Sequence, residues 1–447
     1  MAKTFRNFNQ RTFFLIYFFV LIYCLAYYIF LFVFKVIDPS YFLCIEVVNQ
    51  QLKFGSSSFD FLYPLSCDQK NYFIGFENFN NIITTDYYPY QTRSLYILLV
   101  FSIGKILQFV NEIFSLNINL ILNISTLITQ ILIVSISIYL IDKLLKKYFN
   151  YDNFSLFLIT GFVTVSPLIK WGIFTPSHQL LTLLVLITGI YTIENYKEYE
   201  IYKFSILMGI LYLGHRSFLL PYILFLGARF IILKKLNIFD YIKSSIIFAT
   251  PSFIFYLYIR ILGYHPYDAA TEYWGQFIWI FSFWTGKKSE GQWYCQTIPE
   301  NFICYFQDTK STLIYLLVPI IFISVKEFTD VYFYKKNKLK IINFAILFAF
   351  LMYGFYSFIG WYPPLRFNLY SIGNCLTLIG CLQIVRDENL RDNVLYFSSM
   401  FLYFLNLNHW NYPDVINFNN SLFIVLLLMF IYFLIKHKEY KKLKLNN

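Results

Sequence analysis

The sequence predicts an all-α, polytopic transmembrane protein with about 11–13 spans, and three observations lead to that fold class. Of the 447 residues, 58% are hydrophobic and only 14% are charged, which is too little charge to cover a soluble chain of this length. About twelve apolar stretches follow one another, many of them long enough for a helix to cross the ~30 Å hydrocarbon core. Lysine and arginine fall almost entirely in alternate gaps between these stretches, as the positive-inside rule requires.

Each apolar stretch is expected to be a helix, because backbone groups inside lipid must hydrogen-bond within their own segment. The expected spans, in chain order, lie at residues 12–36, 117–142, 154–173, 179–195, 204–214, 217–233, 241–262, 312–325, 341–359, 367–385, 393–407 and 421–435.

The cations orient these spans. Lys3, Arg6 and Arg11 precede the first span and hold the N-terminus in the cytoplasm, and a lysine-rich tail after residue 435 holds the C-terminus on the same side. The first span is too long for a secretion signal and lacks a small-residue cleavage site, so it is interpreted as a retained anchor. The predicted location is the inner (plasma) membrane, as a multi-pass protein. The net charge of +11 then reflects cytoplasmic loops that contact anionic lipid, and no nucleic-acid motif accompanies it.

Three regions follow from this topology. Residues 1–262 form an N-terminal transmembrane module that includes a long outer loop at 37–116, residues 263–311 form a second outer loop, and residues 312–447 form the C-terminal helices. Segment 94–112 is apolar enough to cross, but a crossing there would place the lysines after the 117–142 span outside. It is therefore predicted to be a juxtamembrane helix in the outer leaflet.

Four cysteines lie in the predicted outer loops, in an oxidising compartment. The simplest disulfide pairing is Cys44–Cys67 and Cys295–Cys304, although four cysteines allow other connectivities. A metal site is the rival interpretation, but the spacings do not fit zinc and no clustered histidines accompany them.

Several cations map to the outer ends of the spans. Together, Arg93, Arg216 and Arg366 suit the phosphate or pyrophosphate head of an isoprenoid lipid carrier, and His178 maps to the same side of the membrane. The alternative for any one of them is that it extends from a span to ordinary lipid headgroups at the interface.

Two outer carboxylates are candidates for a general base. Asp38 follows the first span at the membrane surface, and Asp86 lies shortly before Arg93 in Thr-Thr-Asp-Tyr-Tyr-Pro-Tyr-Gln-Thr-Arg. A base that deprotonates an acceptor hydroxyl beside an anionic leaving group needs one carboxylate and a nearby cation. Either aspartate with Arg93 meets that need.

The order of these features resembles the GT-C glycosyltransferases of the protein mannosyltransferase and aminoarabinose transferase type. An Asp and a long outer loop follow the first span, and Arg-Ser-Leu-Tyr-Ile-Leu-Leu then opens an apolar segment. Later come Thr-Val-Ser-Pro-Leu-Ile-Lys-Trp (164–171) and Trp-Tyr-Pro-Pro-Leu-Arg-Phe (361–367). The chain departs from the family's pattern at Asp38-Pro39, at Ser94-Leu95 and at Ser177-His178-Gln179.

The resemblance implies transfer of a sugar from a polyprenyl-phosphate donor to a glycan, lipid or protein acceptor outside the membrane. By that resemblance Asp38 or Asp86 is the base, Arg93 and Arg366 hold the donor phosphate, and His178 lies at the rim. No cofactor is firmly implied, and a divalent metal stays open.

Three other functions compete with this one. An O-antigen type polymerase or ligase also uses arginines for a lipid pyrophosphate, but its largest outer loop lies late in the chain. A transporter or flippase of lipid-linked sugars predicts charges buried in the middle of spans and internal pseudosymmetry, and neither is found here. A membrane scaffold without activity gives no reason for cations to gather at separate outer loops.

Overall fold

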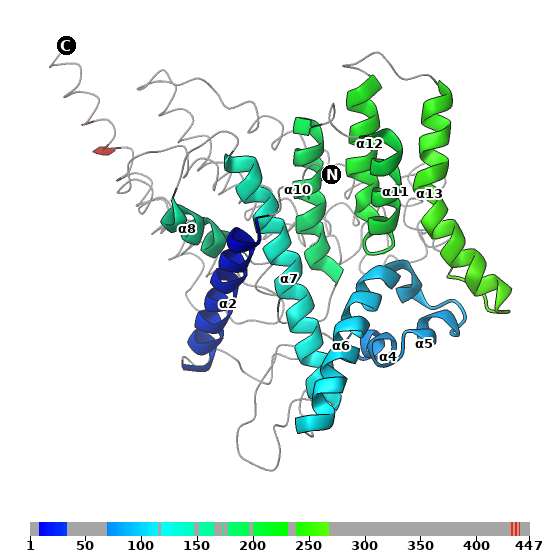
Figure 1. The fold of residues 1–447 in the computed structure, drawn as a ribbon, viewed down its shortest axis with the longest axis horizontal. Coiled ribbons are helices and arrows are strands. Elements are labelled where there is room, and N and C mark those ends of the chain that lie inside the picture. Colours follow the sequence, from blue (N-terminus) through cyan, green and yellow to red (C-terminus); the bar gives the residue numbers. More distant parts are fainter. Residues whose placement is uncertain are drawn as a thin grey trace, which may run out of the picture. The chain divides into compact units, whose positions relative to one another are not determined.

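The computed structural model describes residues 9–33, 69–114, 118–146, 152–164, 173, 178–195, 200–230 and 238–267, with a few single positions between 431 and 438. These residues are mainly helical, and no strand occurs among them (Figure 1). The α-helices are α2 (Gln10–Val33), α4 (Gln69–Glu77), α5 (Asn80–Ile83), α6 (Ser94–Phe114), α7 (Ile118–Lys146), α8 (Asn153–Thr164), α10 (Leu181–Asn195), α11 (Ile201–Tyr212), α12 (Leu219–Ala228) and α13 (Ile238–Ile261).

Helices occur where apolar spans were expected. Each of α2, α7, α8, α10, α11, α12 and α13 overlaps one predicted span, so their helical state is confirmed. Three helical segments are long and apolar enough to cross a membrane: Pro89–Phe109, Ile124–Leu144 and Ile238–Ile261. Shorter apolar helices accompany them in the described part of the chain. Association with a membrane is therefore indicated.

Helix α6 confirms the helix predicted at 94–112. It runs for 21 residues, and together with the turn before it, it is one of the segments able to span a bilayer. Its predicted place in the outer leaflet rests on the lysine pattern and stays a prediction. The predicted spans after residue 311 lie outside the described residues, apart from a few positions at the end of the last one.

The described residues divide into two compact units. The larger contains α4, α5, α6 and α10 to α13, with most of α2 and α7. Within it α10, α11, α12 and α13 stand side by side (Figure 1). Helix α11 packs on both α12 and α13, and α10 packs on α12, while α4 packs on α5 and α6.

A buried hydroxyl network joins α11, α12 and α13. The Ser244 hydroxyl lies 2.7 Å from the Ser205 hydroxyl and 2.9 Å from the Tyr222 hydroxyl. The Tyr222 ring stacks on Phe248 with 4.3 Å between the centroids. Hydrogen bonds between helices and close packing hold helices together where the surroundings are apolar.

Helices α11 and α13 approach closely at Gly209. A Cβ at this position would collide with the Phe248 backbone carbonyl oxygen and lie 3.2 Å from the Pro251 ring. Glycine is therefore required for the contact, because any larger residue would force the two backbones apart. Pro251 lies inside α13 and removes one backbone hydrogen bond there.

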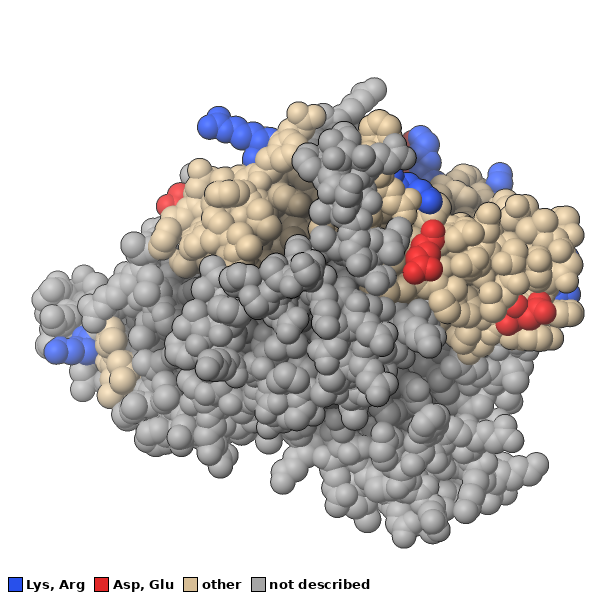
Figure 2. Space-filling model, turned by 90° about the horizontal axis from the view of Figure 1, so that it is seen from below, with Lys and Arg blue, Asp and Glu red and all other residues tan. Residues whose placement is uncertain are grey.

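One face of α13 is apolar and exposed. Ile246, Phe253 and Ile261 are 62%, 65% and 73% exposed. Most of the described surface that is visible in Figure 2 likewise carries no charge. An exposed apolar helix face of this kind matches a helix that contacts lipid.

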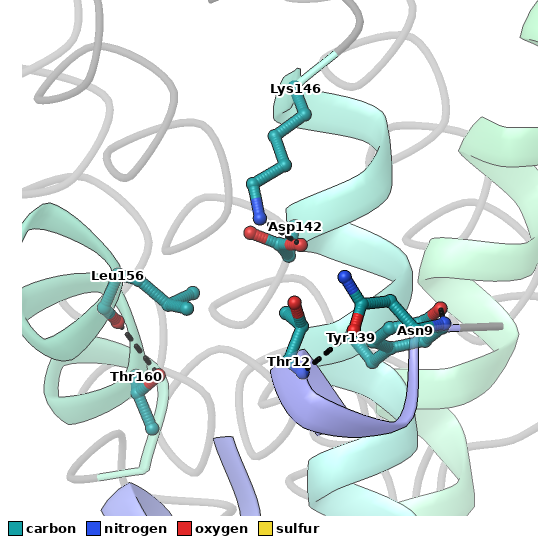
Figure 3. A network of polar contacts seen from close by, with 7 residues as sticks. All are labelled: Asn9, Thr12, Tyr139, Asp142, Lys146, Leu156 and Thr160. Carbon is teal, nitrogen blue, oxygen red and sulfur yellow. Dashed lines mark hydrogen bonds and ion pairs between the residues drawn. The ribbon is translucent and has the colours of Figure 1, made fainter. Parts of the chain in front are cut away.

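In the larger unit, the start of α2 contacts α7. The Asn9 backbone N–H donates to the Tyr139 hydroxyl at 2.9 Å (Figure 3), and the Phe13 ring meets Tyr139 edge to face.

The smaller unit contains α8, the last residues of α7 and part of α2. There Lys146 pairs with the buried Asp142 at 3.0 Å near the end of α7, where a cation is favoured by the helix dipole (Figure 3). The Tyr23 ring stacks on Phe157 of α8, and its hydroxyl donates to the Phe157 carbonyl oxygen at 3.2 Å.

Candidate anion-binding site

Three helices of the larger unit begin with a short 3₁₀ turn that carries a candidate residue. Turn η2 (Pro89–Arg93) leads into α6, η3 (His178–Leu180) leads into α10, and η4 (Arg216–Phe218) leads into α12. The turns are close together, since η4 packs against α10 and the Leu95 N–H donates to the Leu213 carbonyl oxygen at 3.2 Å. The positive ends of three helix dipoles therefore lie in one region.

Tyr72 of α4 connects two of these turns. Arg93 Nη1 donates to the Tyr72 hydroxyl oxygen at 3.2 Å, and that hydroxyl lies 2.6 Å from His178 Nδ1. The Arg93 guanidinium also lies over the Tyr90 ring, 4.8 Å from its centroid. Aromatic rings and one hydroxyl thus fix the position of the guanidinium.

His215 adds a second imidazole. Its ring stacks on His178 with 5.0 Å between centroids and 29° between the planes. Its Nδ1 accepts the Ser217 backbone N–H at 3.2 Å, which caps turn η4. Tyr72, Arg93, His178, His215 and Arg216 are called the histidine–arginine cluster below.

Burial and positive charge keep both imidazoles neutral. Burial is the main reason that the pKa of His178 is well below its usual range, and the positive charge of Arg93, the neighbouring His215 and the positive charge of Arg216 lower it further. Burial, followed by Arg93 and Arg216, lowers the pKa of His215 to about 3. No carboxylate of the described residues is among the charges that shift either histidine. The cluster is a positively charged site whose histidines are uncharged at neutral pH.

Comparison with protein-family models, curated protein sequences and solved structures finds no match to this chain. The site is therefore interpreted from its own residues.

Of the residues predicted from sequence, the fold brings Arg93, His178 and Arg216 together. Asp86 lies in the same unit but is exposed and bonded elsewhere. The other predicted positions lie outside the described residues: Asp38, Arg366, Cys44, Cys67, Cys295 and Cys304.

Asp86 fastens the loop before η2 to the segment after α13. Its Oδ1 accepts the His265 backbone N–H at 2.6 Å, and the Tyr87 N–H donates to the His265 carbonyl oxygen at 2.9 Å. The Tyr87 and His265 rings stack with 5.4 Å between centroids and 5° between the planes. Tyr87 has a φ of 52°, in the left-handed region that a bulky side chain seldom adopts.

Gln91 extends the same contact. Its Oε1 accepts the Tyr267 backbone N–H at 2.7 Å, and its Nε2 donates to the carbonyl oxygens of Ile82 and Thr85. Asp86, Tyr87, Gln91, His265 and Tyr267 are called the loop clamp below. The clamp holds the loop that carries Arg93, so Asp86 has a structural role that sequence reasoning did not predict.

Two residues of the cluster were missed as site residues. His215 lies between Gly214 and Arg216, in the short polar stretch between two apolar spans. This interruption of the apolar pattern is the sequence feature that could have identified His215 as a site residue. Tyr72 lies among other aromatic residues, and no sequence pattern sets it apart. Within the described part of the chain, no group of three His, Cys, Asp or Glu side chains could hold a metal ion.

Proposed function

We propose that this chain is a multi-pass, GT-C-like glycosyltransferase of the inner membrane. It would move a sugar from a polyprenyl-phosphate donor to an acceptor on the outer face, with both termini in the cytoplasm. The observation that carries the proposal is the pair of arginines, Arg93 and Arg216, that act on two buried neutral histidines where three helices begin. Such a site is suited to a phosphate group.

The chemistry requires such a site. Transfer of the sugar breaks the bond between its anomeric carbon and the phosphate oxygen, so negative charge grows on the departing phosphate. Donors and cations that are already in place lower the energy of that charge without rearranging. A carboxylate must take the proton of the acceptor hydroxyl, and Asp38 and Asp86 are the proposed candidates. Arg366 would add a further phosphate contact.

The donor site is tested with Arg93→Ala. Loss of a charge-assisted hydrogen bond typically costs about 1.5–3 kcal/mol, so we expect the apparent affinity for a polyprenyl-phosphate sugar to fall by roughly 10–100-fold. Lys105→Ala is the matched control. Lys105 lies on α6 with its ammonium 5.3 Å from the Phe101 ring centroid, yet it is exposed and outside the cluster. An unchanged affinity in Arg93→Ala would contradict the phosphate role.

The reaction class is tested by comparing the lipid-linked and surface glycans of cells with and without the gene by mass spectrometry. Loss of a single sugar or branch would support the transferase. A collapsed chain-length distribution would favour a polymerase, and intact glycans would favour transport.

A further inference from the structure

The hydrogen bond that His215 accepts determines where its proton is. The Ser217 backbone N–H can only donate, so the His215 Nδ1 at 3.2 Å must present a lone pair. A neutral imidazole carries its proton on the other nitrogen. His215 therefore presents an Nε2–H.

For His178 the proton is assigned as part of the proposal below. The Tyr72 oxygen accepts from Arg93 and lies 2.6 Å from His178 Nδ1, and we assign its phenolic proton to that nitrogen. His178, which burial and the arginines keep neutral, then also carries its proton on Nε2. Both rings use Nδ1 as an acceptor toward the protein.

In each ring, Nε2 is the nitrogen that is left to bind a ligand. His178 and His215 are 8% and 7% exposed, and the hydrogen bonds recorded for each ring involve Nδ1. A buried N–H group needs a hydrogen-bond acceptor to offset the free energy of its desolvation.

We propose that the Nε2–H groups of neutral His178 and His215 bind the non-bridging oxygens of a phosphate ester, together with Arg93 and Arg216. The subsite consists only of hydrogen-bond donors. It deepens the proposed function, because it rests on the polyprenyl-phosphate donor and assigns the atoms that bind its phosphate.

A donor-only subsite excludes two other roles for these histidines. A metal ion binds a lone pair, and the lone pair of each ring already accepts a hydrogen bond from the protein. A general base needs that same lone pair, so neither histidine takes the acceptor proton. The phosphate ester is bound without metal and without a change in the protonation of the imidazoles.

Substitution of each histidine by asparagine or by glutamine distinguishes the roles of its two ring nitrogens. Asparagine places an amide oxygen near the position of Nδ1 and removes the outer donor, whereas glutamine places an N–H near Nε2 and removes the inner acceptor. The experiment measures binding of a farnesyl phosphodiester, which keeps one negative charge near neutral pH, to the full chain in detergent with EDTA present.

For His215 we expect roughly 10–100-fold weaker binding in His215→Asn and a loss of no more than about threefold in His215→Gln. His178→Asn and His178→Gln should follow the same order. A purely structural role at Nδ1 predicts the reverse, because asparagine keeps the bond to the Ser217 N–H. Equal binding in the two variants, the reverse order, or loss of wild-type binding in EDTA would each overturn the subsite. Lys105→Ala is the control, since Lys105 is exposed on α6 and lies outside the cluster.

The ligand source and the proposed function are tested separately. Displacement of the probe by phosphatidylglycerol as readily as by a polyprenyl phosphate would overturn the assignment to the polyprenyl donor in favour of ordinary lipid headgroups. If the wild-type chain binds the probe but deletion of the gene leaves every glycan intact, the transferase proposal fails and the subsite stands. If sugar transfer occurs but the asparagine and glutamine variants bind alike, the subsite fails and the transferase stands.

Discussion

Two stacked histidines near two arginines would be repelled by positive charge if they were protonated. The His178 and His215 rings stack on each other, and burial with the charges of Arg93 and Arg216 lowers the pKa of both, that of His215 to about 3. In the unfolded chain a histidine has a pKa of about 6.5. Between these values the unfolded state binds more protons than the folded state, so stability falls as pH falls.

We therefore predict that acid destabilises the histidine–arginine cluster. The effect is absent above about pH 6.5 and grows below it by roughly 1 kcal/mol per pH unit for each histidine. Thermal unfolding in detergent between pH 8 and pH 5 measures it. His215→Asn, which cannot titrate, should show a shallower decline than the wild type. A decline that is the same in wild type and His215→Asn would contradict the prediction.

Asp86 can be tested as a clamp residue and as a base with one pair of variants. Asp86→Asn keeps an Oδ1 that accepts the His265 N–H, whereas Asp86→Ala removes it. If Asp86 only holds the loop, transfer should survive in Asp86→Asn and fall in Asp86→Ala, together with a melting temperature lower by a few degrees for about 1 kcal/mol. Loss of transfer in Asp86→Asn at an unchanged melting temperature would assign the base to Asp86 instead.

The sequence predicted the cluster only in part. Arg93, His178 and Arg216 were identified because each charged or titratable residue lies at the outer end of an apolar stretch, which is a local signal. Tyr72 and the stacking of His215 on His178 depend on contacts between residues far apart in the chain. No local pattern contains that information.

Among the elements, the long helices were the predictable part. Apolar length specifies a span, and α7 and α13 follow their predicted ranges closely. The three 3₁₀ turns that start α6, α10 and α12 were not predicted, since they are only three to five residues long. The loop clamp was missed because it joins the Asp86 side chain to the backbone of His265, which lies far away in the chain.

Gly209 provides a test of the α11–α13 contact. Gly209→Val places atoms against the Phe248 backbone and the Pro251 ring, and we expect a loss of about 1–3 kcal/mol. Gly227→Ala is the control in α12. It meets nothing within 4 Å and should be neutral or stabilising by up to about 1 kcal/mol. Thermal unfolding of both variants in detergent measures the difference, and equal melting temperatures would contradict the close contact.

For the whole molecule, the unresolved question is whether α6 crosses the bilayer. The lysines after α7 predict that α6 stays on one side, so cysteines introduced at Tyr88 and Ser115, before and after the helix, should both react with an impermeant thiol reagent from outside. Lys147→Cys should react only after the membrane is permeabilised. The signal of the parent chain, with its own seven cysteines, gives the background. Opposite sides for Tyr88 and Ser115 would make α6 a span and reverse the orientation of every later helix.

Tyr87 has a consequence for how the molecule moves. A bulky residue in the left-handed region costs of order 1–3 kcal/mol, and Tyr87 is held there by His265 and is itself 58% exposed. When the segment that contains Tyr87 separates from His265, this strain is released, and it offsets part of the free energy of the hydrogen bonds that are lost. Release of the segment that runs from Tyr87 to Arg93 therefore costs less free energy than its hydrogen bonds alone would suggest. Its amides should exchange with solvent deuterium well before those of α10, so a donor headgroup could enter and leave by local opening while the surrounding helices stay packed.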